Sequence, residues 1–505
     1  MLEIKDLSII VNHKYIIKDL SLTLNQKDKL AIIGEEGNGK STLLKAILGI
    51  CDYAEVDGII NLKGNRIGYL EQSISNKYLK KTVYEYLFQN DEDYYDKIGD
   101  FYRYLEVFQF SDSVLNERVE NLSGGEKVKV SILRLLLEDD DILLLDEPTN
   151  DLDIETLEWL ENFINYTDKP IIYVSHDETL LSHTANMILH LEQINHKTDC
   201  RHTLLRSDYD SYVENRLRSI EKQTQVARSE RRNYEKQQEK LRQVMQKVEH
   251  QQNTITRRDP HGGRLLKKKM HALKSQEKKL MSTSLTEIPD VEEGIHFFFE
   301  KVELPRTKVV LKLDIDELKI KEKVLARNVK LEVIGNEHLC IIGKNGVGKS
   351  TLMKKIYKEL KQREDIKLGY MPQTYDDVLD GDMLVLEFIA PSGNIEDVTK
   401  ARTMLGNMKL TSDEMTGKIK NLSNGTKAKL LLMKLVLEKC NVLLLDEPTR
   451  NVSPLSNPMI RKVLKEYQGA IISISHDRKY MEEVVDTLYV LTKDGLKRIS
   501  NENLN

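Results

Sequence analysis

The chain has 505 residues, with 76 Lys and Arg against 81 Asp and Glu, and a formal net charge of −5. At about 100–200 residues per domain, this length allows three units, each with its own core. No apolar run approaches the roughly 20 residues that span a bilayer, and Met1 to Asp6 reads as a strand, not as a signal segment. The four cysteines lack metal-ligand spacing, so reduced thiols are expected. The composition thus excludes a membrane-spanning protein and predicts a cytoplasmic one.

The first chemical signal is a glycine-rich loop that directly follows the apolar run 30–33. The loop reads Gly34-Glu35-Glu36-Gly37-Asn38-Gly39-Lys40-Ser41, which fits the phosphate-loop pattern. Such a loop exposes backbone N–H groups at a helix N-terminus, where they can hold β- and γ-phosphates while Lys40 neutralises charge and Ser41 binds Mg²⁺. The loop therefore predicts a nucleotide site.

Two further short apolar runs, 141–145 and 170–174, end at Asp146-Glu147 and at Ser175-His176-Asp177. Apolar runs this short between helical stretches are typical of buried parallel strands. In open α/β sheets, ligand groups gather at the carboxyl ends of such strands. The first part of the chain is therefore expected to be an α/β domain.

A strongly basic segment follows. Residues 214–283 contain 19 Lys and Arg and 8 Asp and Glu, a net charge of +11. Apolar residues recur at three- and four-residue steps, which predicts two helices of a coiled-coil hairpin. These residues are Val213, Leu217, Ile220, Leu241, Val244, Val248, Leu266, Met270, Leu273 and Leu280. Asp259-Pro260 resembles an N-cap followed by Pro at the first helical position, so the turn is expected around 251–259.

The charge of this hairpin has two interpretations. It is either a solvated coiled coil that couples its neighbours or docks a protein, or a surface that contacts a polyanion. The second is favoured because exposed helices usually interleave both signs, whereas this segment is more than two to one basic. Tyr234 is the only aromatic residue in 214–283 and no finger or RNA-recognition consensus is present, so we expect backbone and shape contact with folded RNA. The predicted RNA contacts are Arg257, Arg258, Arg264, Lys267, Lys268 and Lys269.

The landmarks of the first part then recur in the same order. Residues 343–350 form a second phosphate loop, after the apolar run 339–342. Three other segments recur 300 residues further on: Asn121 to Lys127 as Asn421 to Lys427, Leu143 to Thr149 as Leu443 to Thr449, and Ser175-His176-Asp177 as Ser475-His476-Asp477. An ordered set that occurs twice predicts two nucleotide-binding domains.

This set resembles the ATP-binding-cassette superfamily, with Walker A, a glutamine loop, a signature, Walker B with its following Glu, and a switch His. The resemblance implies two P-loop α/β cassettes joined by a long helical hairpin, with two ATP molecules sandwiched head to tail. It implies the following nucleotide-binding residues: Gly34, Gly37, Asn38, Gly39, Lys40, Ser41, Thr42 and Gln72 with Ser423 and Gly425, and Gly343, Asn345, Gly346, Gly348, Lys349, Ser350, Thr351 and Gln373 with Ser123, Gly124 and Gly125.

The same resemblance implies the chemistry of each site. The Mg²⁺ ligands would be Ser41, Gln72 and Asp146 in one site and Ser350, Gln373 and Asp446 in the other. Glu147 and Glu447 would polarise the attacking water, and His176 and His476 would sense the γ-phosphate. The second signature has Asn424 and Thr426 where the first has Gly124 and Glu126. We therefore expect the ATP held by Lys40 to turn over more slowly than the ATP held by Lys349.

The adenine contact has two interpretations in the sequence. Tyr15 either stacks on the base in the first cassette or packs as an ordinary strand-end Tyr. Residues 311–335 contain no aromatic residue that could do the same in the second cassette.

Over essentially the whole chain the resemblance narrows to the ABC-F family, soluble tandem-cassette ATPases that bind the ribosomal E site and push their linker toward the P-site tRNA and the peptidyl-transferase centre. Two segments resemble its antibiotic-resistance branch: Glu447 to Ser456, where an ordinary cassette has Asn-Asp-Leu-Asp, and the tip Arg258 to Lys269. From Gln72 to the signature Ser is 51 residues, against 50 from Gln373, so the arm insertion of housekeeping relatives is absent or very short.

This resemblance implies a cytoplasmic, ribosome-associated ATPase that protects the ribosome from drugs and acts as a monomer. Its cofactors would be ATP and Mg²⁺, and its partners the 70S ribosome at the E site, 23S rRNA and P-site tRNA, without membrane or DNA. Three other interpretations stay open: a drug-independent translation factor of the same family, the ATPase subunit of a transporter, and a DNA-repair cassette protein. The expected domains are cassette 1 at 1–211, the hairpin at 212–291 with its tip at about 250–263, and cassette 2 at 292–505.

Overall fold

The computed structural model describes residues 1–88, 90–108, 110, 112–194, 197–254, 260–282, 286, 304–408 and 410–499. The chain forms two compact units. One comprises Met1–Asp210 with Glu292–Asn505 and holds both cassettes, and the other is Ser211–Val291. The boundaries drawn from the sequence stay predictions, and the boundary at 291/292 lies outside the described residues.

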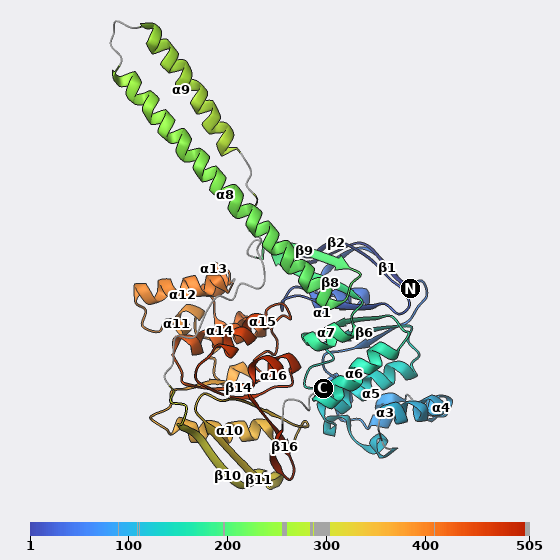
Figure 1. Ribbon diagram of the computed structural model, residues 1–505. Helices are drawn as coiled ribbons and strands as arrows, with labels where there is room; N and C mark the ends of the chain where they lie inside the picture. Colours follow the sequence, from blue (N-terminus) through green and yellow to red (C-terminus); the bar gives the residue numbers. More distant parts are fainter. Residues whose placement is uncertain are drawn as a thin grey trace. The chain divides into compact units, whose positions relative to one another are not determined.

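Cassette 1 contains two sheets (Figure 1). The antiparallel sheet has the order β2-β1-β4, with β1 (Leu2–Val11), β2 (Lys14–Leu24) and β4 (Glu55–Asn61). The other sheet has the order β5-β6-β7-β3-β8-β9, formed by β3 (Lys29–Ile33), β5 (Ile67–Leu70), β6 (Ile142–Asp146), β7 (Ile171–Val174), β8 (Met187–Ile194) and β9 (Asp199–Leu205). All its neighbouring strands are parallel except β8 and β9. The predicted parallel-strand P-loop sheet is confirmed.

The helices of cassette 1 connect strands of the large sheet, and α2 to α5 all lie between β5 and β6. They are α1 (Lys40–Ile47), α2 (Asn76–Leu79), α3 (Val83–Leu87), α4 (Asp91–Phe108), α5 (Gly124–Leu137), α6 (Ile154–Tyr166) and α7 (Glu178–Thr184). Apolar residues of both sheets and of α1 form one buried core, which includes Leu2, Ile17, Leu30 and Leu44. The strands that carry the ligand groups are therefore fixed by core packing.

Cassette 2 repeats the large sheet, in the order β13-β14-β15-β12-β16-β17. Its strands are β12 (His338–Ile342), β13 (Leu368–Met371), β14 (Val442–Asp446), β15 (Ala470–Ile474), β16 (Thr487–Thr492) and β17 (Gly495–Ile499), and β10 (Val309–Ile320) pairs antiparallel with β11 (Lys323–Ile334). Its helices are α10 (Lys349–Lys361), α11 (Val385–Ile389), α12 (Ile395–Asn407), α13 (Ser412–Thr416), α14 (Asn424–Leu437), α15 (Asn457–Lys465) and α16 (Arg478–Val484).

The two cassettes differ between the phosphate loop and the glutamine loop. Lys40 lies 32 residues before Gln72, whereas Lys349 lies 24 residues before Gln373. In cassette 1 this interval contains the strand β4, which extends the small sheet beyond β1. In the described part of cassette 2 the small sheet consists of β10 and β11 alone. The extra residues of the first interval thus build an additional strand.

The second unit is the predicted helical hairpin. Its helices are α8 (Tyr209–Thr254), which begins at the end of the first unit, and α9 (Pro260–Met281), and they run side by side in opposite directions (Figure 1). At about 1.5 Å per residue, the 46 residues of α8 span roughly 69 Å. Pro260 is the first residue of α9, as predicted, while Asp259 lies outside the described residues.

The apolar stripe of the hairpin is narrower than the sequence suggests. Val248 and Leu273 are buried, whereas Leu217 and Val244 are 45% and 39% exposed. A heptad pattern drifts around a straight α-helix, so some apolar residues of a long helix face solvent. None of the described helices is long and apolar enough to cross a membrane.

Candidate ATP sites

Both phosphate loops adopt a backbone that requires glycine. The φ angles of Gly34 and Gly39 are 145° and 88°, and those of Gly343 and Gly348 are 151° and 110°. A Cβ atom on Gly34 would lie 2.3 Å from the carbonyl oxygen of Leu191. Each loop therefore depends on glycine both for its backbone angles and for close packing. The loops end at the first turns of α1 and α10, whose N–H groups are available to anions.

The lysine of each loop points back over the loop. Lys40 Nζ donates hydrogen bonds to the carbonyl oxygens of Gly34 (2.8 Å) and Glu35 (3.0 Å). Lys349 Nζ donates to the carbonyl oxygen of Gly343 (2.6 Å), and burial lowers the pKa of this ammonium group. Both ammonium groups thus lie against the carbonyl oxygens of their own loops, where they could neutralise the charge of a bound polyphosphate.

Oxygen ligands suited to Mg²⁺ lie beside each loop. Ser41 Oγ donates to Asp146 Oδ1 (3.0 Å). Burial raises the pKa of Asp146, and it raises the pKa of Asp446 to about 6. A buried carboxylate beside a hydroxyl group is a donor set that a hard divalent cation prefers, so these residues fit Mg²⁺. The described part of the chain has no cluster of three or more His, Cys, Asp or Glu side chains that could bind another metal.

The Glu predicted to be catalytic in the first site, Glu147, is held by three donors. Glu147 Oε2 accepts hydrogen bonds from Asn150 Nδ2 (2.7 Å) and Gln72 Nε2 (3.2 Å), and Oε1 lies 3.4 Å from His176 Nε2. Burial alone would raise the pKa of Glu147, but the contacts with His176 and Asn150 outweigh it and lower the pKa to about 2. Val452 of cassette 2 in turn fixes His176, because its carbonyl oxygen lies 2.9 Å from His176 Nδ1. The first catalytic centre is thus assembled from both cassettes.

The corresponding Glu of the second site, Glu447, has fewer and longer contacts than Glu147. Its described hydrogen bond is from the backbone N–H of His476 to Glu447 Oε2 (3.4 Å), and His476 Nε2 lies 4.0 Å from Oε1. Among the described residues, neither of the buried ring nitrogens of His476 has a hydrogen-bond partner. Burial and then the charge of Asp446 raise the pKa of Glu447 to about 8, and burial lowers the pKa of His476 to about 4.

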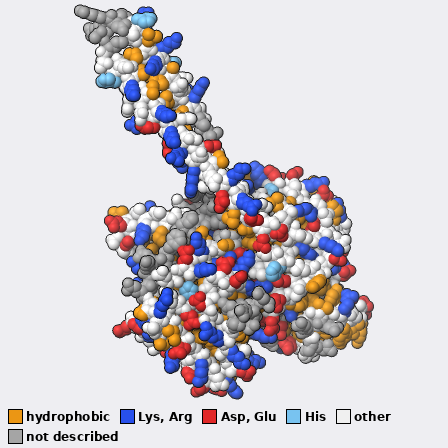
Figure 2. Space-filling view, viewed as in Figure 1, with side chains coloured by type: hydrophobic (Ala, Val, Ile, Leu, Met, Phe, Trp, Pro, Cys, Tyr) orange, Lys and Arg blue, Asp and Glu red, His pale blue; other side chains and the backbone are white. Residues whose placement is uncertain are grey.

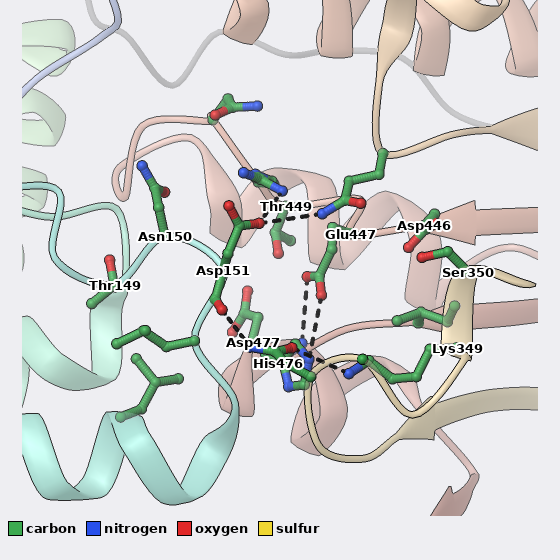
Figure 3. Close-up of a pocket in the computed structure, with 18 of the residues that line it drawn as sticks. Thr149, Asn150, Asp151, Lys349, Ser350, Asp446, Glu447, Thr449, His476 and Asp477 are labelled. Atoms are coloured by element: carbon green, nitrogen blue, oxygen red, sulfur yellow. Dashed lines mark hydrogen bonds and ion pairs between the residues drawn. The ribbon is translucent and has the colours of Figure 1, made fainter. Parts of the chain in front are cut away.

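Asp151 of cassette 1 explains this difference (Figure 3). Its Oδ1 accepts from Gln373 Nε2 (3.4 Å) and pairs with Arg450 (2.8 Å). Gln373 and Arg450 are the counterparts of Gln72 and Asn150, which hold Glu147 in the first site. In cassette 1, Gln72 and Asn150 therefore bind Glu147 of the same cassette. In cassette 2, their counterparts bind Asp151 of cassette 1 instead. Gln72 and Gln373 contact Glu147 and Asp151, and their assignment as Mg²⁺ ligands stays a prediction.

The first signature lies beside the second phosphate loop. A cavity of about 1040 Å³ is lined by Ser123 and Gly124 together with Gly343, Asn345 and Gly346. A cavity of about 390 Å³ continues the site past Lys349, Ser350, Gln373, Asp446, Glu447 and His476. Asn345 Nδ2 also donates to the carbonyl oxygen of Asp151. The structure thus brings together the residues predicted for the second ATP.

The second signature lies beside the first phosphate loop. Ser423 caps α14 by accepting from the N–H of Thr426 (3.2 Å), and the N–H of Gly425 donates to Glu36 Oε2 (2.7 Å). Glu36 belongs to the first loop, so Gly425 and the Lys40 site are adjacent. The predicted Asn38 is buried and donates to the carbonyl oxygen of Leu191 (2.8 Å), so it supports the loop.

The base pockets show a residue that the sequence did not reveal. A Cβ atom on Gly39 would lie 2.2 Å from Ile16, and one on Gly348 would lie 2.9 Å from Leu325. Ile16 and Leu325 thus hold equivalent places, so Val324 is the counterpart of Tyr15. Val324 lines the larger cavity of the second site and is 36% exposed, and Tyr15 is 47% exposed. Spacing is the sequence signal that could have identified Val324, because Tyr15 and Val324 each lie 19 residues before the first glycine of their phosphate loop.

Buried ion pairs between the cassettes were also missed. Arg461, 2% exposed, donates to both carboxylate oxygens of Glu178 (2.5 and 3.2 Å), and Arg478 pairs with Glu161. Glu178 and Arg478 directly follow the switch motifs at 175–177 and 475–477. The sequence shows that these residues are charged, but charge alone does not indicate which residue of the other cassette each one binds.

The predicted RNA contacts belong to the hairpin. Arg264, Lys267, Lys268 and Lys269 lie on α9 and are exposed, while Arg257 and Arg258 lie outside the described residues. Every described Lys and Arg of α9 is exposed, and Lys and Arg side chains cover much of the visible face of the hairpin (Figure 2). The basic charge of this segment is therefore available to a partner.

Two phosphate-loop cassettes, each completed by residues of the other, define a tandem ATPase. The family model described as "ABC transporter" matches residues 17–150 and 326–450, more than half of the chain, and the protein belongs to this family of ATP hydrolases. The relatives include the putative ATP-binding protein YdiF of Bacillus subtilis, which is 26% identical over 98% of this chain and 81% of its own. ABC transporter F family member 5 of Arabidopsis thaliana is 26% identical over 95% of this chain and 73% of its own. Such relatives support the ABC-F subfamily.

Solved structures show the same fold. The archaeal ribosome recycling factor aABCE1, in complex with the ribosomal stalk protein aP1, has a TM-score of 0.61 at 17% identity, with 97% of this chain and 90% of that chain covered. The RNase-L inhibitor has a TM-score of 0.59 at 16% identity, with the same coverage. The fold of this chain is thus shared with these solved structures.

Proposed function

We propose that this ATPase binds the ribosome at the E site and protects it from antibiotics that act at the peptidyl-transferase centre. In the ATP-bound form the two cassettes close, and the hairpin is inserted beside the P-site tRNA. Hydrolysis of ATP then releases the protein. The working partners are 23S rRNA and the P-site tRNA, and the site of action is the cytoplasm.

The observation that carries this proposal is the exposed basic charge of the hairpin. Its net charge of +11 contrasts with −5 for the whole chain, so the rest of the protein is acidic. Neutralising phosphates releases counterions, which drives binding to nucleic acid without a base-specific contact. Tyr234 is the only aromatic residue between 214 and 283, so base stacking is not the main mode of recognition. Folded RNA is the polyanion that fits.

The cassettes supply the switch for this binding. Each catalytic centre contains contacts from both cassettes, such as His176 with Val452 and Asp151 with Arg450. A nucleotide between the cassettes would strengthen these contacts, and loss of its γ-phosphate would weaken them. One solved structure with this fold is that of an archaeal ribosome recycling factor, a role that fits the same partner.

The role of the hairpin tip in reaching the peptidyl-transferase centre is tested by replacing residues 251–263 with a short Gly-Ser turn. The variant should lose resistance to lincosamides, pleuromutilins, streptogramin A, phenicols or macrolides in a sensitive host. It should keep its basal ATPase activity and much of its ribosome pelleting, because the cassettes and most of the basic charge remain. Full protection by this variant would contradict the proposal. Wild-type protein that confers no resistance but relieves stalled ribosomes would favour a drug-independent translation factor.

Charge is tested separately by replacing Lys267, Lys268 and Lys269 with Gln. These three exposed residues lie near the tip, and their loss should weaken ribosome pelleting most above physiological salt, where the screening length falls below about 8 Å. The matched control replaces Lys274, Lys278 and Lys279, which are also exposed on α9 and lie further from the tip. Equal losses in both variants would show that only total charge matters. Co-purification with membranes instead of ribosomes would favour a transporter subunit.

A further inference from the structure

The first phosphate loop carries two acidic residues that both contact the opposite signature helix. Glu36 Oε2 accepts a hydrogen bond from the N–H of Gly425 (2.7 Å), in the first turn of α14. Glu35 Oε1 pairs with Lys429 Nζ (2.5 Å), one turn further along the same helix. Lys429 is 7% exposed, so this pair is largely shielded from solvent. The two carboxylates thus attach loop 1 to two successive turns of α14.

The second loop lacks this arrangement. The residue aligned with Glu36 is Asn345, which is neutral and donates to the carbonyl oxygen of Asp151. The signature helix that faces it, α5, has its own acid, because Glu126 Oε2 accepts from the N–H of Ser123 (2.8 Å) in a capping box. The acid and the helix that it caps therefore belong to the same cassette.

In α14, Thr426 replaces this capping acid, and the first turn contains no acidic residue. The positive end of a helix dipole favours a nearby negative charge. Glu36 supplies that charge from the opposite cassette. The N-terminus of α14, which lacks an acid of its own, is thus contacted by the acid of the first loop, Glu36.

The same N–H group is the one that would bind the γ-phosphate of ATP held by Lys40. A carboxylate and a phosphate cannot both occupy it, because they would share one donor and repel each other. Glu36 is an exposed residue, so its carboxylate can return to water when it is displaced. ADP has no γ-phosphate and does not compete for this group.

We propose that Glu36 is a positioning residue that takes the place of the γ-phosphate on α14 and gates ATP binding at the first site. When ATP is absent, Glu36 and Glu35 hold the signature helix against the phosphate loop. ATP must displace Glu36 to reach Gly425, whereas ADP does not have to. The first site therefore discriminates against ATP relative to ADP more than the second site does.

The test measures equilibrium binding of a fluorescent ribose-labelled ATP, with Mg²⁺, to the full chain carrying Lys349→Ala, which leaves the first site. Glu36→Asn, which copies the residue of the second loop, should tighten ATP binding about tenfold, the scale of one charge-assisted hydrogen bond. Binding of the corresponding ADP probe should change by less than about twofold. Glu36→Gln should behave as Glu36→Asn does, and Glu36→Asp should keep the affinity of the parent.

The matched control is Asn345→Glu in a chain carrying Lys40→Ala. It introduces an acid opposite α5, which Glu126 already caps, so ATP binding at the second site should weaken while ADP binding is retained. Unchanged ATP affinity in both Glu36→Asn and Glu36→Gln would overturn the proposal. An equal gain for ATP and ADP would also overturn it, because general electrostatics would then suffice. No ribosome is needed, so the result is independent of the function proposed above.

Discussion

The two predicted catalytic centres of this protein share a Glu, a Gln and a switch His but connect them differently. In the first, Asn150 and Gln72 bind Glu147, and Val452 of the other cassette fixes the switch His176. In the second, Gln373 and Arg450 bind Asp151 of the other cassette, and Glu447 is left with a long hydrogen bond from the backbone N–H of His476.

The signatures differ in the opposite sense. The helix α5, which faces the second site, has glycine at 124 and a complete capping box, whereas α14, which faces the first site, has Asn424 and Thr426. The first site thus has a Glu with several hydrogen bonds and faces the altered signature. The second site has a Glu with one long hydrogen bond and faces the unaltered signature. The raised pKa of Glu447 makes its ionised carboxylate a stronger base toward water than Glu147, whose pKa is lowered. This comparison leads us to expect faster turnover at the second site.

Removing both catalytic carboxylates should have the largest effect. Gln keeps the shape of Glu but cannot take a proton, so Glu147→Gln with Glu447→Gln should lower ATPase activity about 10²–10⁴-fold while ATP still binds. The closed form should then stay on ribosomes and be toxic on expression. Sedimentation with ribosomes in ATP measures this. Pelleting no better than wild type would contradict the clamp model that both sites share.

The junction between the cassettes is tested by Arg461→Met. This change removes the nearer partner of the buried Glu178 and leaves Lys479 at 3.6 Å, so it should cost about 3 kcal/mol in the free energy of unfolding, the lower end for breaking a buried pair. Adding Glu178→Leu should recover most of that loss, since an apolar pair of similar volume can replace a buried ion pair. Urea unfolding of both variants measures the difference. A single mutant as stable as wild type would show that the junction does not hold the two sites together.

The base pockets are compared by Val324→Tyr. A Tyr at this position would give the second site the ring that Tyr15 offers in the first, and stacking adds about 0.5–1.5 kcal/mol, or roughly 2–13-fold in ATP affinity. Binding of labelled ATP to a chain carrying Lys40→Ala measures the gain. The matched change Tyr15→Val should weaken ATP binding at the first site, and no change in either variant would exclude base stacking at these positions.

Asp151→Asn should have the smallest effect. It removes the charge that attracts Arg450 and copies Asn451 of cassette 2. The pair is partly exposed, so its loss is worth at most about 1 kcal/mol, or roughly fivefold. We expect turnover at the second site to change by that factor and turnover at the first site to stay constant. Single-turnover rates of the two Lys→Ala backgrounds would show whether the change is confined to one site.

Much of this architecture follows from the sequence. The short runs before Gly34, Asp146 and Ser175 predict the parallel strands because such runs can only be buried, and Pro260 predicts the start of α9. The repeat at a distance of 300 residues predicts the second cassette. The phosphate loops and the acidic pairs therefore fall where expected at the carboxyl ends of strands.

The remainder depends on distances between residues far apart in the chain. The contacts of Asp151 with Arg450, of Arg461 with Glu178 and of Glu36 with Gly425 each join the two cassettes. Periodicity and motif spacing describe neighbours along one helix or strand, so they carry no signal for such pairs. The hydrogen bond from Gln72 to Glu147 is also invisible in the sequence, because it depends on how two distant segments pack in three dimensions.

The inequality of the two ATP sites is tested most directly by the steady-state ATPase activity of the single variants Glu147→Gln and Glu447→Gln, measured side by side. Glu447→Gln should lower the activity more, because it inactivates the site that faces the intact signature. The residual activity of Glu447→Gln would then report the slow site held by Lys40. Equal losses, or a larger loss in Glu147→Gln, would contradict the account.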